Sequence, residues 1–340
     1  MNKKVMIGVC SSIVVFLASS TLLAGDSVYR AQLNSRSASR ALSGVSAPVL
    51  VRKAGPGTEA VVKTIADSLS VSSRCVVGWS AFKSENEANR QFLTGDNWTL
   101  SVSDQGQHLR FRTEPSEQLP RVPEASRPID SSIESWGRAF ISNELKDIVR
   151  LGPDDELVFL GTQYEVVVAM KAGSQVVEPA FVSEVAAVFG RRFRQADLVG
   201  AGSRIAVLMA VDSRISGFDV DWPTYEVSRV VENGADIETV EARSQQLSRG
   251  ELERHSSGRV VRKQFECGYH DGGARNSVRT PEIHLACVAQ YSAATNRGAL
   301  TAIVEVIPAA REIPDNTWWP EAATLRGRPL VPDPSYAPKD

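Results

Sequence analysis

The sequence predicts an α+β protein, with helices packed on one face of antiparallel sheets. Two observations support this prediction most directly. Apolar residues recur at helical spacing near residues 58–69 and 130–148, and a more polar helical stretch spans residues 236–254. Short runs rich in β-branched and aromatic residues, which are typical of strands, follow the second and third of these stretches.

The composition excludes some classes of function. The chain has 340 residues, of which 42% are hydrophobic, and this length is enough for about two domains with their own cores. Its formal net charge is −2, with both signs interspersed and no long run of like charge. We therefore expect no nucleic-acid partner.

Residues 1–24 predict a secretory signal peptide. Lys3 and Lys4 form a short cationic start, and residues 5–24 are apolar and uncharged. The alternative is an uncleaved membrane anchor, because about 20 apolar residues can span a bilayer. In that case the membrane is contacted only through this segment. We expect a secreted, periplasmic or cell-envelope protein.

The next part of the chain divides at residue 55. Residues 25–55 are rich in Ser, Ala and Arg, and they predict a disordered leader. Residues 56–128 predict an N-terminal α+β region that begins with a helix at Thr58. Within it, alternating residues on both sides of the turn at residues 104–106 predict a β-hairpin.

Residues 129–230 predict a second α+β domain. Its helix has capping oxygens at residues 130–132 and an apolar face that includes Ile133, Trp136 and Phe140. Four apolar runs with the residue types of strands follow this helix. The domain is therefore expected to place one helix against a sheet.

Two glycines in this domain, Gly200 and Gly202, raise the question of a phosphate-binding loop. A dinucleotide fingerprint needs a helix that begins directly after its glycines. Here residues 204–211 are strand-like, and the usual third glycine is absent. We therefore interpret both glycines as a structural turn, in which they supply backbone φ values that other residues resist.

The segment FGRRFRQADLVGAGSRIAVLMAVDSRISGFDVDW, residues 189–222, resembles the PepSY/FTP-type modules of secreted metallopeptidase propeptides. In those modules a G-x-P-V-x-G bend joins two strands. Val199, Gly200 and Gly202 keep the later part of that bend, whereas Leu198 replaces its proline. With the preceding helix, the match covers residues 130–227. It implies a cystatin-like, non-catalytic module that binds or restrains a peptidase.

Residues 231–310 predict a β-rich C-terminal region, and residues 311–340 predict a Pro-rich tail on the surface. Cys267 and Cys287 are the natural disulfide pair in an oxidising compartment. Cys75 is then left over. Inert burial of its thiol and a bond to another chain both stay open.

A metal-dependent hydrolase is the enzymatic alternative. The disulfide would tether His270 and His284 in one loop, where they would share a metal with Asp271 or Glu282. The competing interpretation of this stretch is a turn, because Asp and Gly favour turns. The chain has neither a His-Glu-x-x-His pair nor a G-x-S-x-G elbow. We assign no catalytic residue and expect no cofactor.

We therefore predict a non-catalytic binding module with a protein or peptide partner. One edge strand of its sheet would pair with an extended segment of that partner. Arg191, Arg192 and Arg194 are candidates for contacting an acidic partner, although such a run also guards exposed strand edges against aggregation. A structural envelope protein, held at the membrane by residues 1–24, is the third hypothesis.

Overall fold

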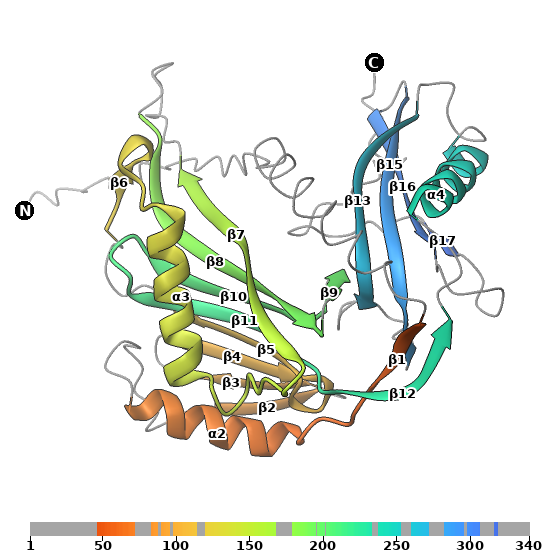
Figure 1. Cartoon of the computed structure of the whole chain (residues 1–340). Helices are drawn as coiled ribbons and strands as arrows, with labels where there is room; N and C mark the ends of the chain where they lie inside the picture. Colours follow the sequence, from red (N-terminus) through yellow and green to blue (C-terminus); the bar gives the residue numbers. More distant parts are fainter. Residues whose placement is uncertain are drawn as a thin grey trace, which may run out of the picture.

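The computed structural model of the chain is a sheet-dominated α+β structure (Figure 1), as predicted. Its described residues contain three α-helices, and none of these is long and apolar enough to cross a membrane. The predicted signal peptide and Cys75 lie outside the described residues. Those residues are 46–71, 83–87, 90–95, 98–113, 120–167, 179–194, 196–200, 202–232, 237–252, 260–271, 282–295, 298–306 and 316–318.

The first structural unit is a helix followed by four antiparallel strands. Helix α2 (Thr58–Val71) begins at the predicted residue and buries Val61, Val62 and Ile65. Strands and the short 3-10 helix follow in the order β2 (Lys83–Glu87), β3 (Arg90–Thr94), β4 (Trp98–Ser103), η1 (Asp104–Gly106) and β5 (His108–Thr113). β4 and β5 pair around η1, which confirms the predicted hairpin.

The second unit repeats this arrangement. Helix α3 (Asp130–Glu144) buries Ile133 and Phe140, as its apolar face predicts. Before it come β6 (Val122–Pro123) and η2 (Glu124–Ser126). After it, the antiparallel strands are β7 (Asp155–Val167), β8 (Phe181–Phe193), β10 (Arg204–Ala210) and β11 (Ile215–Asp221).

The third unit again places a helix before four antiparallel strands. Its elements are α4 (Ile237–Leu252), β13 (Val260–Asp271), β15 (Leu285–Thr295), β16 (Gly298–Val306) and β17 (Asn316–Trp318). All three units therefore share one connectivity. This repeat is not apparent in the sequence, because the topology recurs without a recurring residue pattern.

The first two units join into one continuous sheet through their last strands. β5 and β11 pair antiparallel, with Phe111 directly opposite Phe218 and the two ring centres 5.1 Å apart. Figure 1 shows α2 and α3 on the same face of this sheet. One hydrophobic core contains residues from both helices and from both sets of strands.

Short strands connect the third unit to the other two. β9 (Ala196–Gly200) pairs antiparallel with the end of β8 and parallel with the end of β13. A separate three-stranded sheet has the order β12-β1-β14, with β1 (Ser46–Arg52), β12 (Tyr225–Glu232) and β14 (Glu282–Ile283). A second hydrophobic core lies at this junction and includes Leu50, Phe193 and Tyr269.

Strand β1 corrects the predicted disordered leader, residues 25–55, at its C-terminal end; residues 25–45 lie outside the described residues. Residues 46–52 form the central strand of the three-stranded sheet, and both Val49 and Leu50 are fully buried. The Ser- and Ala-rich composition concealed this strand, because its partners come from segments far along the chain.

Candidate functional site

A buried cluster of polar side chains lies where β1, β12 and β13 meet. Asp271, the last residue of β13, is 1% exposed and forms an ion pair with Arg52 of β1. The hydroxyl of Tyr225, the first residue of β12, donates a hydrogen bond to the same carboxylate. The hydroxyl oxygen of Ser203 lies 2.7 Å from that of Tyr225. We call Arg52, Ser203, Tyr225 and Asp271 the anchor cluster.

Arg191 packs against the anchor cluster from β8. Its guanidinium donates to both carboxylate oxygens of Asp155, at 2.8 and 2.5 Å, and to the carbonyl oxygen of Pro223 at 2.6 Å. It also lies 4.9 Å from the centre of the Tyr225 ring. Because its side chain is only 4% exposed, Arg191 is a structural residue. This burial corrects the expectation that Arg191 contacts a partner.

Burial also strengthens the hold of Tyr225 on its phenolic proton. Withdrawal of the phenol from water raises the pKa of Tyr225 to about 12. A phenol with the ordinary pKa of 10 is already protonated at physiological pH, so the shift matters only above pH 10, where it preserves the hydrogen bond that the hydroxyl donates to Asp271. The first residue of β12 is thus fixed to the last residue of β13.

The predicted glycine turn packs against Asp271 of the anchor cluster. β9 ends at Gly200, and the strand β10 follows the turn in place of a helix. The backbone N–H of Gly202 donates to the carbonyl oxygen of Asp271 at 2.9 Å, and a methyl group at Gly202 would overlap the Asp271 carboxylate. The left-handed φ of this turn, 51°, belongs to Ser203. Gly202 is therefore required for close packing, and not for the unusual φ that we predicted.

Beyond Tyr225, strand β12 leaves the interior. Its side chains from 226 to 230 are exposed, with Val227 at 41% and Val230 at 61%. In the described part of the chain, the other large apolar side chains with such exposure are Ile129 and Leu151. β12 is the outer strand beside β1 (Figure 1), and no other described strand pairs with its second edge.

A β-bulge brings the two exposed valines to one face. Val227 lies opposite Leu50 and Val230 lies opposite Pro48, so two steps along β1 match three steps along β12. Residues two apart on a strand point to the same face. Val227 and Val230 therefore extend the face on which Leu50 is buried. An apolar stripe results, next to an open strand edge.

Ion pairs flank β12, whose extended conformation comes from its antiparallel pairing with β1. Glu226 lies 2.9 Å from Lys53, and Arg229 lies 3.1 Å from Glu282, measured between nitrogen and oxygen. The hydrogen bond from Arg229 lowers the pKa of Glu282 below its usual value. Such exposed pairs add little stability. Backbone pairing with β1 keeps the strand extended before a partner arrives, which reduces the entropy lost on pairing.

The two cysteines lie directly opposite each other on β13 and β15, and the structure joins Cys267 to Cys287 in a disulfide bond. β13 is the outer strand of the third unit beside β9, and β15 is its neighbour within the unit. The bond therefore ties together the two strands that precede and follow the 272–281 connection. Its position supports the end of β13, where the anchor cluster begins.

The structure does not assemble the predicted metal cluster. The backbone N–H of His270 donates to the carbonyl oxygen of His284 at 3.1 Å, so the two histidines are neighbours. Asp271 is the next residue of β13 and therefore points to the opposite face, where it binds Arg52. Within the described ranges, no group of three His, Cys, Asp or Glu side chains could hold a metal ion.

The other two arginines of the predicted partner-binding run lie at the surface. Arg192 is 2.7 Å from Asp197 and 2.9 Å from Glu156, whereas Arg194 is 3.3 Å from Asp154. The side chain of Arg194 is 52% exposed and that of Arg192 is 27% exposed. Both remain within reach of a partner, and their contact with one stays a prediction.

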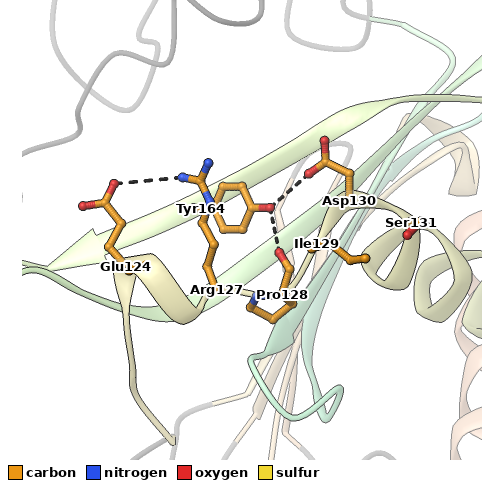
Figure 2. Close-up of a pocket in the computed structure, with 8 residues that line it drawn as sticks. Glu124, Arg127, Pro128, Ile129, Asp130, Ser131 and Tyr164 are labelled. Carbon is orange, nitrogen blue, oxygen red and sulfur yellow. Dashed lines mark hydrogen bonds and ion pairs between the residues drawn. The ribbon is translucent and has the colours of Figure 1, made fainter.

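A shallow hollow lies at the start of α3 (Figure 2). The hydroxyl of Tyr164 lies 2.9 Å from the carbonyl oxygen of Pro128 and 3.0 Å from Asp130 Oδ1. The Arg127 guanidinium lies 4.5 Å above the same ring. Burial, with the hydrogen bond to Asp130, raises the pKa of Tyr164 to about 12. These contacts pair the polar groups of Tyr164, Arg127 and Asp130 within the hollow, and they hold the segment before α3 against β7.

Comparisons with known proteins show a likeness in structure but none in sequence. No protein-family model matches the chain, and no curated protein matches its sequence. The chain is similar to the Bacillus megaterium YpeB C-terminal domain, with 7% sequence identity and a TM-score of 0.36. The alignment covers 78% of this chain and 99% of that chain.

β12, the element on which this site depends, is not predicted from the sequence. The bulge places its two outward valines three residues apart, so the strand lacks the alternation by which strands are recognised. The signal that could have found it is the cluster of Val227, Val230 and Val231 directly after Trp222-Pro223, since valine favours strands.

Proposed function

We propose that this protein is a non-catalytic binding module that pairs the open edge of β12 with an extended segment of another polypeptide. The exposed edge carries the proposal: β12 has eight residues and a pair of solvent-exposed valines on one face. In strand addition, backbone hydrogen bonds supply affinity and alternate side chains supply specificity. A partner strand with apolar residues opposite Val227 and Val230 would cover both.

β7 is a longer edge strand but a less suitable one. Within the described residues it pairs with β8 alone. Its pairing is interrupted on either side of Leu160 and again between Glu165 and Val166, and its Tyr164 is covered by residues 127–130. Bulges and covering segments are the devices by which proteins protect sheet edges. β12 has one bulge, which gathers its apolar side chains on one face.

The resemblance to PepSY/FTP-type modules makes a secreted peptidase the first partner to test. If the protein restrains one, adding the purified chain to peptidases from the producing organism's culture medium slows their hydrolysis of casein. Val230→Lys should abolish the effect, because it places a charge on the apolar stripe. Equal hydrolysis with and without the wild-type chain would exclude restraint of those peptidases.

Site-specific photo-crosslinking tests strand pairing itself. A photoreactive amino acid is placed at Val230, and in a control at Ile129, which is 67% exposed but lies at the start of α3. Illumination in the producing organism should yield a discrete crosslinked species from position 230 and none from position 129. The proposal fails if position 230 gives no species, or if both positions give the same ones.

A further inference from the structure

The arrangement of side chains along β12 is symmetric about its midpoint. The register with β1 places Tyr225, Val227 and Val230 on one face, and Glu226, Arg229 and Val231 on the other. Position 232 lies opposite Ser46 and so belongs to the face of Tyr225, Val227 and Val230. With the bulged residue 228 on the same side as Arg229, the order of faces is then the same from either end of the strand. An antiparallel copy of β12 can therefore pair with the whole strand without bringing an apolar face against a polar one.

That pairing sets Val227 opposite Val230 of a second copy, and Val230 opposite its Val227. The four valines then form one apolar patch on the face that already buries Leu50. Their exposed fractions, 41% and 61%, show that the described part of the chain leaves this patch uncovered. Apolar and β-branched residues in directly opposite positions stabilise antiparallel pairs.

The charges on the other face are also compatible with self-pairing. Glu226 comes opposite Val231 of the second copy, and Arg229 comes opposite Ser228, so no like charges meet directly. Glu226 and Arg229 of the two copies become diagonal neighbours, within reach of long side chains. The two-fold symmetry forms this pair twice. A strand with this charge pattern is complementary to its own antiparallel copy.

The chain already contains a junction of this kind. β5 and β11 join the first two units by antiparallel pairing, with Phe111 opposite Phe218 and with Arg110 3.3 Å from Asp219. Aromatic contacts on one face and an ion pair on the other thus connect two units of the same topology. β12 offers the same combination, an apolar pair and complementary charges, at an edge that no described strand covers.

We infer that the segment bound by β12 is β12 of a second copy of this chain. The inference rests on the proposed strand pairing. The product is a six-stranded sheet in the order β14-β1-β12-β12-β1-β14 around a two-fold axis between residues 228 and 229. Because eight residues a side make a small interface, the dimer should be weak and its population should depend on protein concentration.

Sedimentation velocity of the purified chain tests the dimer. The register predicts the outcome for two matched double variants, because positions 227 and 230 of opposite copies meet. Val227→Lys/Val230→Lys brings like charges together and should weaken association roughly tenfold. Val227→Lys/Val230→Glu brings opposite charges together and should dimerise like wild type. Ile129→Lys, an equally exposed site elsewhere, should have no effect.

A monomer at all concentrations, or equal weakening by both double variants, would overturn the inference. The photo-crosslinking experiment separates this failure from that of the proposed function. A species with twice the mass of the chain, crosslinked between positions 230 and 227, supports both. A crosslink from position 230 to a different protein supports the proposed strand pairing but shows that the partner is not a second copy of this chain. No species at position 230 excludes both.

Discussion

Replacing Asp271 with asparagine removes the negative charge of the anchor cluster while nearly keeping the side-chain volume. Asp271 is 1% exposed and Arg52 is 10% exposed, so the variant leaves a guanidinium charge in a site that water hardly reaches. Removing one partner of a buried ion pair costs about 3–5 kcal/mol. We expect Asp271→Asn to lower the free energy of unfolding by that amount, measured by urea denaturation of the purified chain.

A surface pair provides the control. Asp212 lies 2.8 Å from Arg214, with both side chains more than 40% exposed, and Asp212→Asn should cost about 0–1 kcal/mol. Adding Arg52→Met to Asp271→Asn removes the buried guanidinium charge that lost its carboxylate, and it should restore part of the lost free energy of unfolding. If Asp271→Asn is no more destabilising than Asp212→Asn, the anchor cluster does not fix β12 to β13, and the account of an ordered edge fails.

Three further predictions concern the same junction. Gly202→Ala should destabilise the protein by about 1–3 kcal/mol in urea denaturation, because its methyl group overlaps Asp271; an unchanged midpoint would contradict the close packing. Reducing the Cys267–Cys287 disulfide should lower the free energy of unfolding by about 3 kcal/mol on the chain-entropy model. The same reducing agent should not change the stability of a Cys267→Ser/Cys287→Ser variant. The raised pKa of Tyr225 contributes stability that is complete below pH 10 and is lost as the pH rises towards 12, roughly 3 kcal/mol in all. Urea denaturation at pH 9 and pH 12 should therefore show a smaller loss in Tyr225→Phe than in wild type.

The helices and the hairpin could be predicted because each depends on neighbours in the sequence. The apolar residues Val61, Val62 and Ile65 of α2 share one helical face, and they do so wherever that helix lies. The turn at residues 104–106 joins two strands that pair with each other. Likewise, the oxidising compartment implied by the predicted signal peptide indicated the pair Cys267 and Cys287.

The candidate site could not be predicted in the same way. His270, Asp271 and His284 looked like one cluster because they are close in sequence. Strand alternation turns Asp271 to the opposite face, where Arg52 binds it. Arg191 looked like a surface residue within an Arg-rich run, yet it lies buried against Asp155 and Tyr225.

The sequence by itself determined the class of fold, the positions of the described helices, the β4–β5 hairpin and the strands that follow α3, because periodicity within one element follows from covalent geometry. Tertiary structure alone decided that β1 is a core strand, that β12 is an open edge and that its two valines share a face. Those properties depend on pairing between β1 and β12, whose residues are distant in the sequence. The register of such a pairing, including its bulge, is set by the packing of the whole junction and leaves no local pattern in either strand.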